Sequence, residues 1–411
     1  MSADHRKPWA LLSYTVASGG VGMHPLTRVE QKEITTICEA ADLDLMHVVL
    51  QADFGQRPDV YREVLRPAGK RRAANRAPRL RFWRQLVHQL KGADVQFEEH
   101  RKHLDAASGA VLGDFLKFGR RQCRADRYAL FFYGHAFGPM GLFYDSKTPD
   151  ATPKTLRLTH LADALRSGSR PVDLVLFRDC FVDTLEMAYQ LRGVARFMIA
   201  SQSGVPIASA WPWPAMLSTL MPSASSLDVS RAVATQLGSF FDVKANRGGD
   251  EAVPVSMIDI EAARAVTKPL GNLVAALESA RRNPARRTAC ARAIDRARVG
   301  HDPAKLGDPA LVDIPTMCRN LQELGRDPAA RAAKTLGEVV STRVIRESHS
   351  RSGRFRGLNI YCKPVTKRDF ERSFIEASDE ADIRNDARYY KTLALCRETG
   401  WDQIALNPLK P

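Results

Sequence analysis

Short apolar runs of strand length recur through the first half of this chain, and helix-length segments separate them. Near-continuous apolar strands that alternate with helices are typical of a parallel sheet with helices on both faces. In such folds the functional side chains lie beyond the carboxyl ends of the strands. The sequence therefore predicts an α/β fold, with strands at Ala10–Ala17, Leu45–Leu50, Val60–Leu65 (as a hairpin arm), Tyr128–Tyr133, Val172–Phe177 and Phe197–Ala200.

The apolar pattern changes beyond about residue 225, where the spacing is mainly helical. One late strand is expected there, at residues 357–362. We predict a core over residues 1–225 that contains the sheet, with a basic insertion at about 62–84. A mainly helical region over residues 226–411 is expected to pack on that core.

The N-terminal run has two interpretations. Arg6 and Lys7 before an apolar stretch resemble a short signal peptide, but Ser13 and Thr15 interrupt the stretch and a glycine pair follows it, which favours a buried first strand. No apolar run reaches the roughly 18 residues of a membrane-spanning helix. The seven cysteines are scattered and form no CxxC pair, so neither a zinc ribbon nor a disulfide scaffold is predicted. We expect a cytoplasmic protein with no membrane partner, no metal and no cofactor.

The chain is strongly basic, with 61 Lys and Arg against 46 Asp and Glu and a net charge of +15. Such a surface attracts polyanions, including nucleic acid and phosphorylated small molecules. Two clusters, at 62–84 and 281–298, hold many of these charges. They are interpreted either as a solvated loop and a solvated helix face, or as an anion site for a nucleotide. The candidate residues of that anion site are Arg71, Arg72, Arg76, Arg281, Arg282, Arg286 and Arg287.

Two predicted central strands end in reactive side chains, His135 after one and Cys180 after the other. From 135 to 180 the separation is 45 residues, which is enough for a loop, a helix and a strand, so the two strands can be neighbours. A thiolate is a nucleophile, and an imidazole beside it can take the thiol proton and later protonate a leaving amine. Amides around Ala136, Phe137 and Gly138 can face an oxyanion. The alternative is a core cysteine and a histidine that caps a strand.

Further fragments surround this His and Cys in a fixed order. They are Trp9–Tyr14, Val48–Asp53, Ala125–Leu130 with Gly134-His135, Phe177–Cys180 with Leu185–Tyr189, Ala200–Gln202 with Trp211–Trp213, Val255–Asp259, Val312–Ile314, Gly357–Tyr361 and Thr399–Asp402. In this order the fragments resemble the clostripain-like cysteine peptidases of the caspase, legumain and gingipain clan. The resemblance covers nearly the whole chain and implies a caspase-like sheet and an endopeptidase of peptide or protein substrates, with His135 and Cys180 as its dyad.

The resemblance also implies a specificity pocket, and the sequence departs from the family there. The family usually has an acid where Arg178 stands, so Arg178 is expected either to disfavour basic substrate residues or to pair with Asp179 or another acid. Phe137 replaces a small residue and is expected to narrow or gate the cleft. The other pocket candidates are Ser201 and Gln202, then Trp211 and Trp213 as a cleft wall or packed aromatics, and Asp53 as a cleft residue or a helix cap.

Family members often cut the loop between their two catalytic strands. The polar stretch at 145–155 lies there, where Lys147 and Lys154 suit a basic specificity and Asp145 and Asp150 an acidic one. We expect the protein to be held inactive until it cleaves itself in this stretch or, alternatively, until it binds an anionic effector. We expect a bacterial stress or defence effector. The rival hypothesis is an inactive caspase-like scaffold whose basic face holds an anionic ligand or nucleic acid.

Overall fold

The structure of the protein is a computed structural model. The described residues are 6–18, 26–54, 59–67, 93–102, 104–145, 155–168, 170–206, 210–248, 253–300, 307–350, 355–377 and 387–410.

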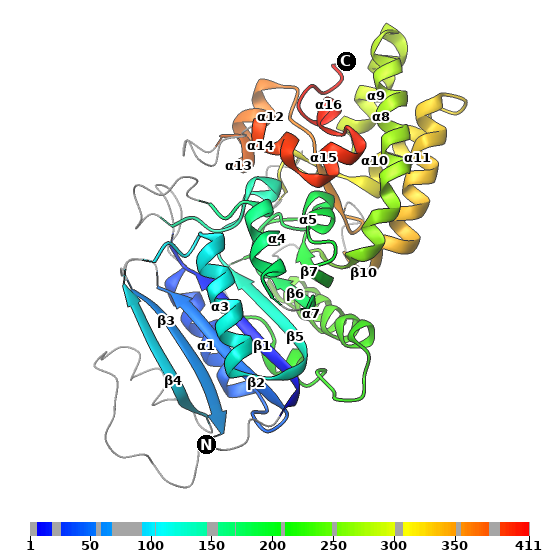
Figure 1. The fold of residues 1–411 in the computed structure, drawn as a ribbon. Coiled ribbons are helices and arrows are strands. Elements are labelled where there is room, and N and C mark those ends of the chain that lie inside the picture. The colour runs from blue at the N-terminus through cyan, green and yellow to red at the C-terminus, as the bar shows by residue number, and fades with distance from the viewer. Residues whose placement is uncertain are drawn as a thin grey trace.

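A nine-stranded sheet forms the centre of the described structure (Figure 1), in the order β10-β8-β7-β6-β5-β1-β2-β3-β4. The central strands β2, β1, β5, β6 and β7 run parallel, and antiparallel strands flank them on each side. Parallel strands covered on both faces confirm the predicted α/β fold. The strands are β1 (Lys7–Val16), β2 (Met46–Asp53), β3 (Asp59–Pro67), β4 (Ala93–Lys102), β5 (Ala125–Tyr133), β6 (Val172–Phe177), β7 (Ala195–Ser201), β8 (Val255–Asp259) and β10 (Ile345–His349).

Helices cover the two faces of the sheet and enclose two apolar cores. Along β5, Leu130 and Phe132 face one core, whereas Phe131 and Tyr133 face the other, as the alternation of a strand requires. One face carries α3 (Gly109–Gln122), α4 (Leu158–Arg166) and α5 (Leu185–Gln190), and the other carries α1 (Thr27–Ala40), α6 (Trp213–Leu217) and α7 (Ser226–Gly248).

The C-terminal part adds a helical layer beside the sheet (Figure 1). A two-stranded sheet of β9 (Leu311–Asp313) and β11 (Asn359–Tyr361) joins this layer to the core through a bridge from Thr184 to Asn359. Its helices are η2 (Glu261–Val266), α8 (Thr267–Arg281), α9 (Pro284–Asp295), α10 (Ile314–Gln322), α11 (Pro328–Val339), η3 (Val340–Val344), α12 (Lys367–Arg372), α13 (Phe374–Ala377), α14 (Ala387–Thr392), α15 (Ala394–Thr399) and α16 (Asp402–Ala405).

Two expectations about the organisation need correction. Strands β8 and β10 come from beyond residue 225 yet extend the main sheet, so the expected boundary does not separate the sheet from the C-terminal part. The expected basic insertion begins inside β3, where Arg62 is buried and pairs with Asp114 at 2.7 Å. Arg62 is therefore a packed strand residue, not part of a solvated loop. Arg71, Arg72 and Arg76 lie outside the described residues.

None of the described helices combines the length and the apolar character that a span of the membrane would need.

Candidate active site

His135 and Cys180 follow neighbouring parallel strands at the same offset. In the register of β5 and β6, Phe132 pairs with Phe177, and the N–H of Arg178 donates to the Phe132 carbonyl at 3.0 Å. Each reactive residue lies three positions beyond its paired phenylalanine. The register thus places both at one edge of the sheet, on adjacent loops.

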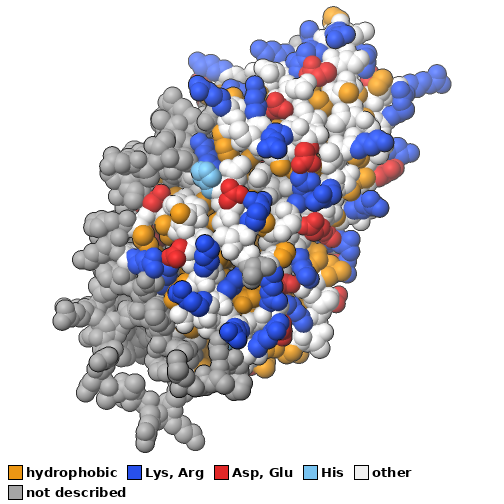
Figure 2. All heavy atoms as spheres, viewed as in Figure 1, with side chains coloured by type: hydrophobic (Ala, Val, Ile, Leu, Met, Phe, Trp, Pro, Cys, Tyr) orange, Lys and Arg blue, Asp and Glu red, His pale blue; other side chains and the backbone are white. Residues whose placement is uncertain are grey.

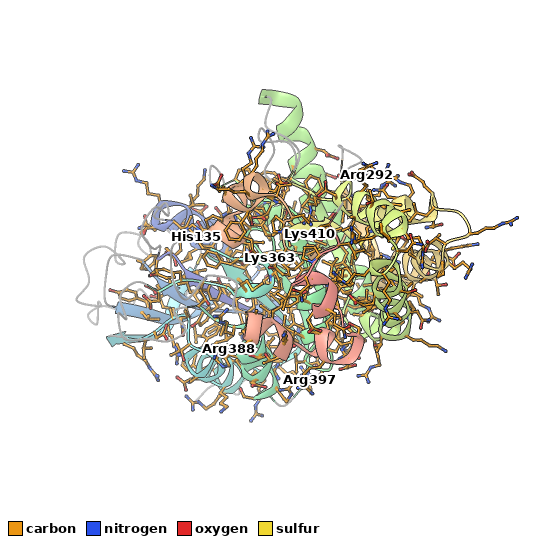
Figure 3. The ribbon with its side chains drawn as sticks, turned by 90° about the horizontal axis from the view of Figure 1, so that it is seen from above. His135, Arg292, Lys363, Arg388, Arg397 and Lys410 are labelled. Carbon is orange, nitrogen blue, oxygen red and sulfur yellow. The ribbon has the colours of Figure 1, made fainter. Side chains whose placement is uncertain are left out.

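The loop that carries His135 is tightly folded. The N–H of Phe143 donates to the carbonyl of His135 at 2.6 Å, and the N–H of Phe137 donates to the carbonyl of Gly141 at 3.0 Å. Gly134 has no space for a side chain, because a Cβ there would lie 2.5 Å from the Phe143 ring and 3.0 Å from the Val16 carbonyl. His135 itself is half-buried, on the side of the molecule seen in Figure 3.

Cys180 differs from the other cysteines in its exposure. All seven are free thiols within the described residues, and Cys180 is partly exposed while the other six are buried. Burial of the thiol raises the pKa of Cys180, and the N–H of Val205, which donates to Sγ at 3.2 Å, opposes that shift. The Val205 carbonyl also lies 4.0 Å from Sγ. A thiol with a raised pKa needs a base before it can act as a nucleophile.

Two backbone N–H groups, on the loops that carry His135 and Cys180, donate no hydrogen bond to another described residue. Among the hydrogen bonds between described residues, neither the amide of Gly138 nor that of Cys180 acts as a donor. Gly138 has a φ of +55°, and Phe181, directly after Cys180, has a φ of +62°. Left-handed backbone is unusual for a phenylalanine and marks a constrained turn at the cysteine.

Arg178 forms an ion pair with a carboxylate that the sequence analysis did not identify. Its Nε lies 2.7 Å from Oε1 of Glu33, on α1, and both side chains are almost fully buried. The guanidinium also lies 5.0 Å from the centre of the Tyr133 ring. Burial raises the pKa of Glu33, and the charge of Arg178 opposes that shift. Of the two alternatives for Arg178, the structure therefore contains the paired one, with Glu33 as the acid.

Glu33 also fixes the two tryptophans. Its carboxylate accepts a hydrogen bond from the N–H of Trp211 at 2.9 Å and another from Nε1 of Trp213. Both indoles are buried against Phe131, so they are packed aromatics in this structure. Sequence reasoning missed Glu33. The available signal was a carboxylate next to the apolar side chains of Ile34 and Ile37, which face the core from α1, at a position where burial requires a partner.

Two aspartates among the pocket candidates, Asp53 and Asp179, are fully buried. Asp53 ends β2, which is separated from β5 by β1, so it lies two strands away from the histidine strand. Asp179 precedes Cys180, and neither of its carboxylate oxygens has a hydrogen-bond partner among the described residues. Burial raises the pKa of Asp179 well above its usual range, although the charge of Arg178 opposes the shift.

Ser201 and Gln202 lie where β7 ends, and Gln202 links that strand to the C-terminal sheet. Its Nε2 donates to Asp313 at 2.9 Å and to the side-chain oxygen of Asn359 at 2.7 Å, and its Oε1 accepts from the N–H of Gly357 at 2.7 Å. The Ser201 hydroxyl accepts a hydrogen bond from the N–H of Ser203 at 3.1 Å. These contacts hold the segment that follows β7 against the core.

The expected self-cleavage loop needs one correction. Asp145 is buried, not exposed, because its carboxylate accepts hydrogen bonds from the N–H of Ala106 at 3.0 Å and from the Ser18 hydroxyl at 3.4 Å. Lys147, Asp150 and Lys154 lie outside the described residues.

The second basic cluster is partly neutralised by acids. Arg281 pairs with Glu278 at 2.9 Å, and Arg286 contacts both carboxylate oxygens of Asp327, at 2.6 and 3.1 Å. Arg282 is exposed and Arg287 is half-buried. Figure 2 shows Lys and Arg side chains spread over the visible face rather than gathered in one patch.

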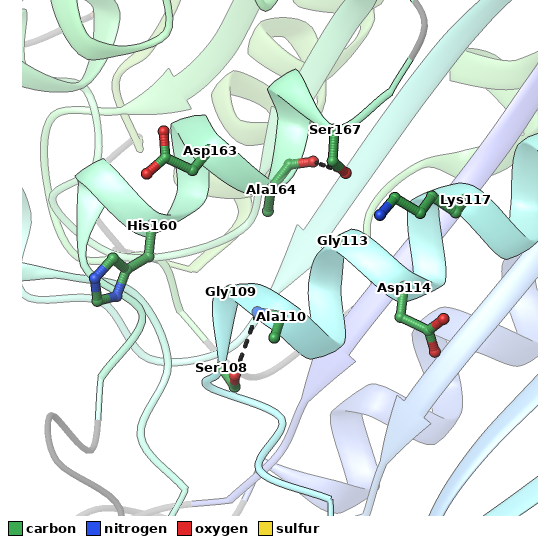
Figure 4. Close-up of a pocket in the computed structure, with 10 residues that line it drawn as sticks. All are labelled: Ser108, Gly109, Ala110, Gly113, Asp114, Lys117, His160, Asp163, Ala164 and Ser167. Carbon is green, nitrogen blue, oxygen red and sulfur yellow. Dashed lines mark hydrogen bonds between the residues drawn. The ribbon is translucent and has the colours of Figure 1, made fainter.

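A groove of about 560 Å³ lies between α3 and α4 (Figure 4). It is lined by residues such as Lys117, His160 and Asp163, and neither His135 nor Cys180 is among them. Within the described residues, no three His, Cys, Asp or Glu side chains gather as a metal site.

Comparison with known proteins gives one family. The model of the clostripain family matches residues 87–378, well over half of the chain. A secreted C11 cysteine protease from Bacteroides thetaiotaomicron, solved with an irreversible peptide inhibitor, has a similar fold, with a TM-score of 0.65 at 15% identity over 96% of this chain and 99% of that one. An inactive zymogen C11 protease from Parabacteroides distasonis gives a TM-score of 0.63 at 14% identity, with the same coverage. No curated protein matches the sequence.

Proposed function

Because the chain belongs to the clostripain family of cysteine endopeptidases, we propose that it cleaves peptide bonds with Cys180 as the nucleophile and His135 as the general base and acid. The observation that carries this proposal is the equal offset of the two residues beyond the paired strands β5 and β6. The partial exposure of Cys180, in contrast to the six buried cysteines, supports the same assignment.

In the proposed reaction, the imidazole of His135 takes the thiol proton of Cys180, and the sulfur attacks the carbonyl carbon of the scissile bond. A C–S bond forms, and the negative charge on the carbonyl oxygen is stabilised by the open amides of Gly138 and Cys180. The C–N bond then breaks, and the imidazolium gives its proton to the leaving amine. Water hydrolyses the thioester and restores the free thiol.

We further propose that the conformation described above is an inactive form. The backbone of Val205 contacts the sulfur through its N–H and its carbonyl, in the segment that follows β7. Burial also raises the pKa of the Cys180 thiol. Displacement of residues 203–206 would free the sulfur for a substrate. Self-cleavage between residues 145 and 155, or binding of an anionic effector, is the proposed trigger.

The ion pair of Arg178 and Glu33 bears on specificity. Since Glu33 balances the guanidinium charge and both side chains are buried, we propose a preference for neutral residues before the scissile bond rather than for Arg or Lys. Ser201, Gln202 and Asp179 complete the proposed pocket. The cytoplasmic location and the role as a stress or defence effector stay predictions.

The rival function, an inactive scaffold for an anionic ligand, is favoured by one observation. Phe137 occupies a position after the histidine where the family usually has a small residue, and its ring is buried beside the proposed oxyanion site. A scaffold of this kind would bind nucleic acid with strong salt dependence and would cleave no peptides.

A proteome-derived peptide library separates the two functions. We would digest it with the wild-type protein and with Cys180→Ala, with and without cell extract as a source of an activator. Cuts made by the wild type alone establish the peptidase, and the residue before each cut tests the proposed neutral preference. An absence of Cys180-dependent cuts in both arms, together with salt-sensitive binding of nucleic acid, would favour the scaffold.

A further inference from the structure

Three aromatic rings meet beside the proposed dyad, although they come from distant parts of the sequence. Phe137 lies two residues after His135, Phe181 directly follows Cys180, and Phe374 begins α13. The rings of Phe137 and Phe374 are stacked, with centroids 5.3 Å apart and planes at 16°. The rings of Phe181 and Phe374 lie 6.5 Å apart. Phe374 therefore touches both loops that carry the reactive residues.

Phe374 exposes apolar surface at this point. It is 41% exposed, whereas Phe137 is fully buried and Phe181 is 9% exposed. Among the described residues, the other large apolar side chains with comparable exposure are Leu45, Met221 and Phe370. An exposed ring with buried aromatic support is a surface on which another apolar side chain can pack.

Hydrogen bonds hold the residues on both sides of Phe374 in place. Asp308 is buried, and its two carboxylate oxygens accept hydrogen bonds from the Ser373 hydroxyl at 2.7 Å and from the N–H of Ile375 at 3.1 Å. Glu376 accepts a hydrogen bond from the hydroxyl of Tyr361. These bonds fix the residues on both sides of Phe374, so its position relative to the dyad is set by the fold.

Ile375, directly after Phe374, contacts the loop that carries His135. A Cβ at Gly138 would lie 2.9 Å from Cδ1 of Ile375, so the two residues are in close contact. Figure 3 shows His135 on the same side of the molecule as the C-terminal helices. The C-terminal part is thus built into the rim of the proposed site.

The sheet order indicates on which side of Cys180 each part of the substrate chain lies. Strand β6, which leads to Cys180, lies between β7 and β5. The proposed pocket for the residue before the scissile bond lies beyond β7, and His135, beyond β5, protonates the leaving amine. The substrate chain after the scissile bond therefore leaves on the β5 side, where Phe137 and Phe374 lie.

We propose that Phe374 forms an apolar subsite that selects a large apolar residue directly after the scissile bond. This inference rests on the proposed function of His135 and Cys180. Phe374 acts on substrate choice, and it takes no part in the proton transfers.

The test compares four proteins on the same peptide library in the presence of cell extract: wild type, Phe374→Ser, Phe370→Ser and Cys180→Ala. Phe370 is the matched control, because it is an exposed aromatic residue of the neighbouring helix α12 that packs against Lys363. We expect wild-type cuts to be enriched in Phe, Leu or Met after the scissile bond. Phe374→Ser should lose that enrichment, and Phe370→Ser should keep it.

Synthetic peptides give the size of the effect. For a peptide with Leu after the scissile bond, Phe374→Ser should lower kcat/KM about tenfold, and for the matched Ser peptide less than about twofold. Phe374→Leu, which preserves apolar volume if the serine variant folds poorly, should keep a preference for aliphatic residues.

Three results would overturn the proposal. An unchanged preference after the cut in Phe374→Ser refutes the subsite while leaving the dyad intact. An equal rise in the cleavage of all peptides would show that Phe374 covers the site instead. An absence of Cys180-dependent cuts in every arm refutes the proposed function itself, and the subsite with it.

Discussion

Arg178 and Glu33 form a buried ion pair directly behind the cysteine loop, with 2.7 Å between Nε and Oε1. The pair joins the residue two positions before Cys180 to helix α1, and through Glu33 it also holds Trp211 and Trp213. One carboxylate therefore connects the strand end, a helix and the segment that follows β7.

Removing one partner of this pair should be strongly destabilising. Glu33→Gln removes the carboxylate that pairs with the buried guanidinium of Arg178, and we expect a loss of about 3–5 kcal/mol in the free energy of unfolding. Urea denaturation measures it. Asp163→Asn, in the exposed pair with Arg166, is the control and should change stability by less than about 1 kcal/mol. Equal losses in the two variants would contradict a special role for the buried pair.

The N–H of Val205 should tune the reactivity of Cys180. That donor lowers the pKa of the thiol against the effect of burial, so Val205→Pro, which removes it, should raise the pKa further and slow alkylation at pH 8. The rate is followed by mass spectrometry of the labelled peptide, with Cys180→Ala as the blank. Faster alkylation in Val205→Pro would contradict this role of the N–H and would mean that the substitution has moved residues 203–206 away from the sulfur.

Glu186 should make stability fall with rising pH. This buried residue accepts hydrogen bonds from the N–H of Tyr361 and the hydroxyl of Tyr390, and burial raises its pKa to about 7. Because the folded pKa lies above the unfolded value of 4.5, its contribution is complete below about pH 4.5 and is lost as pH rises through about 7. The loss is about 3 kcal/mol in total.

Thermal or urea unfolding between pH 5 and pH 9 checks this effect. Glu186→Gln keeps an acceptor without a charge, so its stability relative to the wild type should increase across that range. Glu323→Gln, at an exposed site, is the control and should show no such trend. A relative stability of Glu186→Gln that is independent of pH would refute the assignment.

Gly138 should tolerate a side chain poorly for two separable reasons. Its φ of +55° strains any residue with a Cβ, and that Cβ would press on Ile375. Gly193 has a φ of +76° with nothing within 4 Å, so Gly193→Ala isolates the backbone strain, about 1 kcal/mol. Gly138→Ala should lower the melting temperature more than this control does and should also lower peptide cleavage. Equal melting temperatures would show that Ile375 yields without loss.

The strands and the pairing of the two reactive loops could be predicted from the sequence, because β1, β5 and β6 are continuous apolar runs and parallel neighbours end at one edge. The partner of Arg178 could not be predicted, because 145 positions separate Arg178 from Glu33 and no local sequence pattern identifies which carboxylate it contacts. The burial of Asp145 was missed for the same reason: its partners Ser18 and Ala106 lie far away in the sequence. Likewise, the short strand β8 carries little periodic signal of its own and is defined by pairing with β7 and β10.

Strands β5 and β6 lie on either side of the segment 145–155 and are hydrogen-bonded neighbours. The sheet therefore joins the two halves of the proposed site independently of the covalent connection between them. We expect that a chain cut in that segment would stay associated through the paired strands β5 and β6, with one reactive side chain on each piece. Two separately made fragments are expected to reassemble through the same strand edges.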